Sequence, residues 1–227
     1  MKRAAKLTFE LSPKRRALVE ALLKEEGLSP SPIPRIPRRE TTGELPLSFA
    51  QERLWFLDQL IPNNSFYNVP GGIRLTGALD VGALQQTLQT IVDRHEALRT
   101  TFADVYGRPV QVIHTSLAVP LPVEDLSSLS GAAQEAQVQQ LARAEAEQPF
   151  DLAQGPLLRV KLLRLGEHEH VILLTMHHIV ADGWSLGVFL KEFATLYGAL
   201  VQGQAAKSAY WIASWGKTAG WPWTNAP

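Results

Sequence analysis

Two apolar runs that lie close together in the sequence constrain the fold more than any other feature. The first runs from Leu157 to Leu165 and the second from His170 to Met176, with only the polar residues 166–169 between them. A connection this short joins antiparallel neighbours, because a parallel pair needs a crossover of a dozen or more residues. The two runs therefore predict a β-hairpin, and the sheet that contains it is not purely parallel.

Four segments outside this hairpin favour helices. Ser48 and Asp80 are good N-cap residues, and each precedes a segment with helical character. A third segment is rich in Ala, Gln and Glu, which favour helices, and a fourth has apolar residues at every third or fourth position. The expected helices are residues 49–60, 81–92, 132–147 and 186–200. The face that the last helix is expected to bury carries Phe189, Phe193 and Leu196.

Shorter segments favour further strands. Val69 to Leu75 is expected to be one strand, and residues 100–103 and 110–114 are expected to pair around a turn at residues 107–109. The chain has 227 residues, of which 45% are hydrophobic, so it can bury a sizeable core. The pattern predicts an α/β fold, with helices packed on a mixed β-sheet.

The two ends of the chain differ from this central region. Residues 1–28 are expected to form a separate helical leader, which begins near Ser12 and ends at Gly27. Residues 29–44 are rich in proline and poor in large apolar residues, so they are expected to be an extended linker. Residues 45–204 are expected to form the main lobe. Residues 205–227 hold four of the six tryptophans and form an atypical tail without a clear period.

Composition excludes several classes of function. There are 22 basic and 22 acidic residues, so nothing favours nucleic acid as a partner. The sequence has no cysteine, which rules out disulfides and thiolate metal sites and fits the cytoplasm. No apolar run is long enough to span a bilayer, and the N-terminus lacks the apolar region of a signal peptide, so no membrane role is expected.

Two adjacent histidines, His177 and His178, follow the second run of the hairpin. Histidine exchanges protons near neutral pH, and a strand end opening into a loop is a common place for acid–base groups. Neighbouring residues on a strand point to opposite faces, so only one of the pair can face a given cleft and the other should be structural. Asp182, just after them, could orient an imidazole, bind an arginine, or cap the next helix.

Two other kinds of site are not favoured by the sequence. His168, His170, His177 and His178 together could suggest zinc, but the turn and the strand end lie at opposite ends of one strand, so no metal is expected. Ser185 is not a nucleophile elbow, because the G-x-S-x-G pattern is absent.

Four stretches, in order, carry a resemblance to a known family. They are LPLSFAQERLWFLDQL (45–60), YNVPGGIRLTGALD (67–80), RHEALRTTF (94–102) and HHIVADG (177–183). They resemble motifs of the condensation domains of nonribosomal peptide synthetases, which make secondary metabolites and belong to the chloramphenicol-acetyltransferase-like superfamily. LSPKRRALVEALLKEEG, at residues 11–27, is similar to helices that precede such domains. The resemblance extends from about Leu11 to Gln204.

The resemblance implies a role for each residue of the motif. His178 matches the catalytic histidine, which deprotonates or positions the acceptor's α-amine as the amine attacks a thioester-bound donor. His177 and Asp182 match residues that hold the site together, and Gly183 matches the glycine where the loop approaches the substrate tunnel. The aspartate would pair with an arginine of the second motif, for which Arg99 is the first choice and Arg94 the second.

The resemblance also implies partners. The substrates are carried on the phosphopantetheine of aminoacyl and peptidyl carrier proteins, and no cofactor is bound directly. Complete domains of this kind have two similar lobes with the tunnel between them, and this chain resembles the first lobe alone. We therefore expect a truncated, frameshifted or split domain that has no activity by itself and needs a second lobe or other synthetase modules. The alternative is an inactive remnant or a carrier-protein-docking module.

Overall fold

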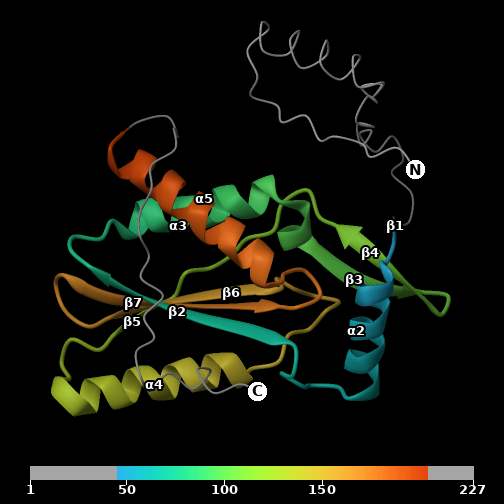
Figure 1. Cartoon of the computed structure of the whole chain (residues 1–227), viewed down its shortest axis with the longest axis horizontal. Coiled ribbons are helices and arrows are strands. Elements are labelled where there is room, and N and C mark those ends of the chain that lie inside the picture. The colour runs from blue at the N-terminus through green and yellow to red at the C-terminus, as the bar shows by residue number, and fades with distance from the viewer. Residues whose placement is uncertain (1–44, 204–227) are drawn as a thin grey trace, which may run out of the picture. The chain divides into compact units, whose positions relative to one another are not determined.

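The computed structural model describes residues 45–203, which Figure 1 shows as coloured ribbons. The predictions for the leader (1–28), the linker (29–44) and the tail (205–227) lie outside these residues and stay predictions. The domain boundaries are likewise untested, because the described residues include only the expected main lobe.

The main sheet has four strands in the order β2-β7-β6-β5. These strands are β2 (Asn68–Thr76), β5 (Val123–Asp125), β6 (Leu158–Arg164) and β7 (Glu169–His177). β7 is antiparallel to both β2 and β6, whereas β5 is parallel to β6. The predicted hairpin is confirmed as β6 and β7, and the sheet is mixed, as predicted.

A second, smaller sheet has the order β1-β4-β3. Its strands are β1 (Leu45–Pro46), β3 (Thr100–Val105) and β4 (Arg108–Ile113). The predicted pairing of β3 with β4 is confirmed, but the turn lies one residue earlier than expected, at Tyr106 and Gly107. Both have positive φ angles, 54° and 79°, which two-residue hairpin turns of this twist require.

Within residues 45–203, four α-helices and one short 3₁₀ helix accompany the sheets. They are α2 (Phe49–Leu60), α3 (Val81–Arg94), η1 (Glu96–Arg99), α4 (Gly131–Glu147) and α5 (Gly183–Val201). Ser48 and Asp80 cap α2 and α3 as predicted, since each side chain accepts a backbone N–H of the first turn. In Figure 1, α3 and α5 lie on one side of the main sheet and α4 on the other, while α2 stands next to the smaller sheet.

The largest part of the core lies between the main sheet and the pair α3 and α5. Its α3 side consists of Leu84, Leu88, Ile91 and Val92, which are almost fully buried. From α5, Phe189 and Leu196 are buried as predicted, but Phe193 is only partly buried. Phe193 lies in a stack between Phe189 and Tyr197, with ring centroids 6.2 and 6.3 Å apart. It therefore borders the core instead of filling it.

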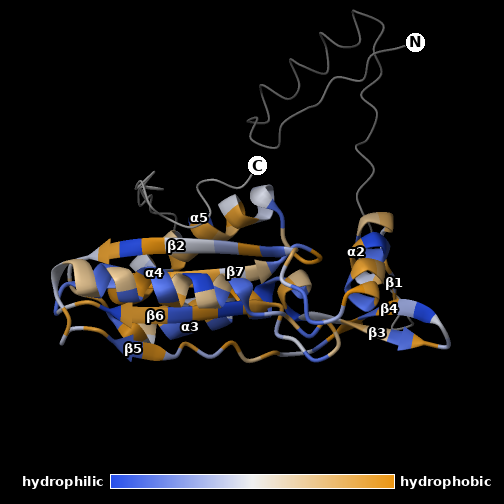
Figure 2. Cartoon of the chain, turned by 90° about the horizontal axis from the view of Figure 1, so that it is seen from below, coloured by the Kyte–Doolittle hydropathy of each residue, from blue (hydrophilic) through white to orange (hydrophobic). Residues whose placement is uncertain are grey.

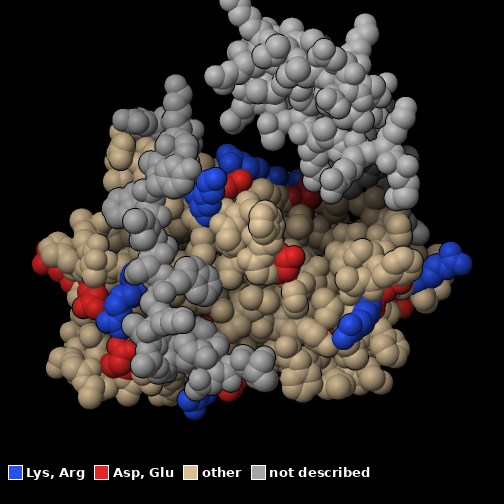
Figure 3. All heavy atoms as spheres, in the orientation of Figure 1, with Lys and Arg blue, Asp and Glu red and all other residues tan. Residues whose placement is uncertain are grey.

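The opposite face of the sheet is covered by α4. Val138 and Ala142 of this helix pack against Leu163, Val171 and Leu173 of the hairpin. Figure 2 shows hydrophobic and hydrophilic residues intermixed along α4, as expected for a helix with one face on a sheet. On the face seen in Figure 3, basic and acidic side chains are scattered and form no single charged patch. No helix within residues 45–203 is long and apolar enough to cross a membrane.

Candidate active site

The two adjacent histidines lie at the carboxyl end of β7 and have opposite environments. His177 is the last residue of the strand and is only 4% exposed, whereas His178 is exposed. The prediction that the two side chains divide between the interior and the surface is confirmed. The rings of Tyr67 and Phe150 contact the His177 ring, with centroids 6.4 and 6.0 Å away.

His177 is held as a neutral ring. Burial and, to a lesser degree, the nearby charge of His178 lower the pKa of His177 to about 4. Its Nδ1 accepts a hydrogen bond from the backbone N–H of Ile179 at 3.1 Å, which requires a lone pair on that nitrogen. This buried histidine therefore supports the loop and does not exchange protons near neutral pH.

His178 has one ring nitrogen bonded to its own loop. Its Nδ1 lies 2.7 Å from the backbone oxygen of Ala181, and its backbone N–H donates to the oxygen of Tyr67 at 2.8 Å. A carbonyl oxygen can only accept, so Nδ1 must carry the proton. In the neutral ring the lone pair is therefore on Nε2. An exposed imidazole with this tautomer can act as a general base.

Asp182 is the N-cap of α5 and is exposed. Its carboxylate accepts the backbone N–H and the hydroxyl of Ser185, both at 2.8 Å, in a reciprocal capping box. The backbone hydrogen bond from Ser185, then the hydroxyl bond, lower the pKa of Asp182, with smaller effects from Trp184 and His178. Of the three roles that the sequence left open, the structure shows the helix cap, and the pairing with an arginine that the resemblance implied is wrong for this structure. An exposed carboxylate at a helix start finds its donors locally, so it needs no such partner.

The two arginines predicted as partners of Asp182 bond other groups. Arg99 ends η1, where its Nη1 donates to the backbone oxygen of His114 and its Nη2 lies 3.6 Å from a carboxylate oxygen of Glu96. Arg94 ends α3 and lies 3.4 Å from Glu192 of α5. Arg99 thus stabilises the segment between α3 and β3, and Arg94 joins the end of α3 to α5. Neither forms an ion pair with Asp182 among the residues that the structure describes.

Gly183 is the first residue of α5 and is exposed. A β-carbon placed there would meet no atom within 4 Å, so nothing within residues 45–203 requires a glycine at this position. The close approach to a substrate tunnel that the resemblance implied stays a prediction.

Sequence reasoning missed several residues that hold the loop. Tyr67 packs against His177 and its backbone oxygen binds His178, while Gln51 of α2 donates to the oxygen of Ile179. His95 lies 2.9 Å from Glu192 and joins the end of α3 to α5. The motifs at 45–60, 67–80 and 94–102 contain these residues, but only the fold shows that all three motifs meet around HHIVADG.

An apolar pocket of about 180 Å³ lies beside the loop. It is formed by α3, η1 and the start of α5, and its walls include His95, Met176, Val180 and Trp184. Trp184 is 84% exposed at the rim. The pocket places an apolar surface next to the residues that bear the candidate chemistry.

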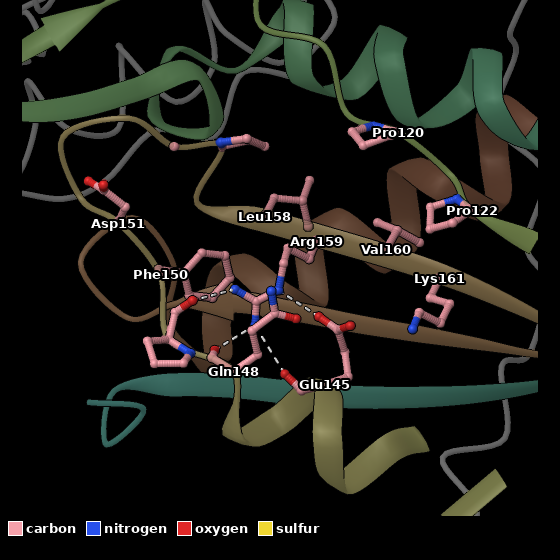
Figure 4. Close-up of a pocket in the computed structure, with 13 residues that line it drawn as sticks. Pro120, Pro122, Glu145, Gln148, Phe150, Asp151, Leu158, Arg159, Val160 and Lys161 are labelled. Atoms are coloured by element: carbon pink, nitrogen blue, oxygen red, sulfur yellow. Dashed lines mark hydrogen bonds and ion pairs between the residues drawn. The ribbon is translucent and has the colours of Figure 1, made fainter. Parts of the chain in front are cut away.

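A larger pocket, about 380 Å³, lies elsewhere, over β6 and the end of α4 (Figure 4). Arg159 occupies its floor, where it bonds Glu145 at 2.6 Å and stacks 3.7 Å above the ring of Phe150. It also donates to backbone oxygens at the end of α4, which have no partners within the helix. None of the predicted site residues lines this pocket. Its connection to the site is indirect, through Phe150 and His177.

Metal ligands do not gather at the candidate site. Within the described part of the chain, no three His, Asp or Glu side chains are grouped closely enough to bind a metal ion. The candidate chemistry rests instead on His178 and the loop that orients it.

Relatives of known function cover most of this chain but are much longer. A linear gramicidin synthase protein from Brevibacillus parabrevis is 46% identical over 204 residues, which is 90% of this chain and 3% of that protein. Chondramide synthase cmdD from Chondromyces crocatus is 50% identical over 170 residues, 75% of this chain and 4% of that protein. Phosphinothricin tripeptide synthetase PhsC from Streptomyces viridochromogenes is 44% identical over 86% of this chain and is covered to 18%. The chain thus spans a small part of each relative.

Solved structures of condensation domains have the same fold as part of this chain. The starter condensation domain of rhizomide synthetase RzmA superposes with a TM-score of 0.68 at 28% identity, over 74% of this chain and 40% of that one. The first condensation domain of the CDA synthetase gives 0.66 at 27% identity, over 75% and 44%. The α/β fold is therefore that of part of a condensation domain, as the resemblance predicted. Residues 41–210 match the model of the condensation domain, and the chain belongs to this family of nonribosomal peptide synthetase domains.

Proposed function

We propose that this chain is the catalytic lobe of a condensation domain that joins aminoacyl or peptidyl groups by an amide bond. The observation that carries the proposal is the geometry of His178. Its side chain is exposed at the strand end, and the Ala181 carbonyl keeps the ring proton on Nδ1. The lone pair of Nε2 is then directed away from this bond and is available to a substrate.

The reaction follows from this lone pair. The α-amine of the acceptor attacks the carbonyl carbon of the donor thioester, a C–N bond forms, and the C–S bond breaks. The amine proton passes to Nε2 of His178 and then to the leaving thiolate, which becomes the free thiol of the donor's phosphopantetheine. The protein needs no cofactor of its own for this step, because both substrates arrive on carrier proteins.

The other residues of the motif support His178 in this proposal. His177 and Asp182 hold the two ends of the loop, and Gly183 begins the helix that follows. Arg99 stabilises the second motif through the His114 carbonyl instead of binding Asp182. His177 and Asp182 thus act on the position of the loop and not on the substrate.

A second lobe is part of the proposal. The chain covers 40% of the RzmA condensation domain, so the remaining walls of the substrate site must come from residues beyond those matched. Catalysis by proximity requires both carrier-bound substrates to be held at once. The proposed partners are therefore two carrier proteins and a second lobe or neighbouring synthetase module. A cytoplasmic location is part of the same proposal and is supported by the lack of cysteine.

The chain covers only part of a condensation domain, which also supports a second candidate function, an inactive or carrier-docking form of the lobe. One experiment distinguishes the two candidates: the chain is mixed with a supplied second lobe and two loaded carrier proteins. Mass spectrometry then detects the dipeptidyl thioester. Catalysis predicts product from the mixture, none from the chain alone, and a loss of about a hundredfold or more in His178→Ala.

The matched control is His168→Ala, which removes another exposed histidine in the turn at the opposite end of β7. This variant should retain full activity. Carrier binding without product would favour the docking module, and unchanged product from His178→Ala would refute the catalytic role.

A further inference from the structure

The first turn of α2 reaches the loop that carries the two histidines. Gln51 is half-buried, and its Nε2 lies 3.3 Å from the backbone oxygen of Ile179, 128 residues further along the chain. Among the hydrogen bonds of the described side chains, this one joins α2 directly to the loop. It is independent of the contacts between the loop and α5.

The orientation of the Gln51 amide is determined by its two partners. Its Oε1 accepts the backbone N–H of Ser48 at 3.0 Å, while its Nε2 donates to Ile179. If the amide were reversed, its N–H groups would face the N–H of Ser48 and its oxygen would face the oxygen of Ile179. Neither contact can be a hydrogen bond, so the reversed orientation is unfavourable. The side chain therefore completes the cap of α2 and fixes the loop at the same time.

Ile179 is held at both of its backbone polar groups. Its N–H donates to Nδ1 of His177, and its oxygen accepts from Gln51. Its side chain is buried in the small cluster with Phe102 and Phe150. Ala181, whose oxygen binds Nδ1 of His178, is only two residues further on. A displacement of the Ile179 peptide would therefore move the carbonyl that sets the His178 tautomer.

We propose that Gln51 is a positioning residue, which holds the loop so that the Ala181 carbonyl stays on Nδ1 of His178. The role in catalysis rests on the function proposed above, but the positioning of the loop does not. Gln51 acts through the Ile179 peptide and has no contact with the His178 ring in the described hydrogen bonds.

The variant Gln51→Glu tests this separately from the helix cap. A glutamate keeps the oxygen that accepts the Ser48 N–H and suits the third position of a capping box, but it cannot donate to Ile179. The matched control is Ser48→Ala, which removes the hydroxyl that caps Gln51 N–H and leaves the bond to Ile179 in place. If Gln51 only stabilised α2, Ser48→Ala would be more damaging than Gln51→Glu.

Two measurements on the full chain without substrate report on the loop. Amide hydrogen exchange at Ile179 and Val180, both bonded within the loop, should become about fivefold faster in Gln51→Glu and stay near wild type in Ser48→Ala. The ¹⁵N shifts of the His178 ring, at mildly alkaline pH, should show the proton on Nδ1 in wild type and a share on Nε2 in Gln51→Glu.

The proposal is overturned if Gln51→Glu leaves both exchange and tautomer unchanged, or if Ser48→Ala alters them equally. Neither readout involves turnover. If Gln51→Glu loosens the loop but the chain never forms product, the proposed function is refuted and the positioning role remains. Reduced product from reconstituted Gln51→Glu, with Ser48→Ala unaffected, would support both.

Discussion

Two neighbouring histidines in this chain have opposite environments because they leave one strand on opposite faces. The alternation of side chains along a strand was enough to predict this division from the sequence. The partner of Asp182 could not be predicted in the same way. An aspartate before a helix can cap it or bind an arginine, and only the positions of Arg94, Arg99 and the start of α5 distinguish the two.

At the residue scale, His177 should make the protein sensitive to acid. Its pKa is about 4 in the folded protein and 6.5 in the unfolded chain, so the unfolded state binds a proton first as the pH falls. The free energy of unfolding should therefore decrease between about pH 6.5 and pH 4, by about 3 kcal/mol in total. Urea unfolding across this range measures it. His177→Gln should remove the contribution of His177 and leave that of His170, whose pKa burial also lowers. His178→Gln, which changes an exposed ring, should keep the contribution of His177; equal pH profiles would contradict the assignment.

The capping role of Asp182 is tested by two substitutions at one position. Asp182→Ala removes the acceptor for the Ser185 N–H and should lower the melting temperature by a few degrees. Asp182→Asn keeps a side-chain oxygen that caps helices as well as aspartate does, so its melting temperature should stay close to wild type. Thermal unfolding compares the three proteins. An ion pair with an arginine would instead make both variants similarly unstable.

At the scale of elements, long periodic segments were predictable and short ones were not. The apolar periods of α3 and α5 and the two runs of the hairpin extend over enough residues to establish a pattern. β1 has two residues and β5 has three, which is too short for any period to be visible. β5 also pairs in parallel with β6 across the intervening helix α4, so its place depends on tertiary contacts.

The different burial of two phenylalanines in α5 predicts different losses of stability when each is replaced by alanine. Phe189 is 6% exposed and lies in the core, so Phe189→Ala should reduce the free energy of unfolding by about 3–5 kcal/mol. Phe193 is partly buried between Phe189 and Tyr197, so Phe193→Ala should cost clearly less. Urea unfolding of the two variants provides the comparison. If Phe193→Ala proved the more damaging, the arrangement of α5 on the sheet would be wrong.

At the scale of the whole molecule, the family and the general fold were predictable from four ordered motifs, and the surroundings of the site were not. The motifs lie far apart in the sequence, yet α2, β2, η1 and the end of β7 meet around one loop. Under the proposed function, the rest of the site comes from a second lobe. The described surface carries large apolar side chains that are well exposed, among them Phe49, Phe66 and Trp184.

Such side chains lead to a prediction about the tryptophan-rich tail, which lies outside the described residues. Trp184 is 84% exposed, and Val188, one turn further along the same helix, is also exposed. Exposed apolar residues favour association unless another segment covers them. We expect residues 205–227 to cover this face, so a chain that ends at Gln204 should self-associate at lower concentration than the full chain. Sedimentation velocity measures this, and Trp184→Ser in the shortened chain should restore the monomer. A shortened chain that stays monomeric at the same concentrations would show that the tail covers no such face.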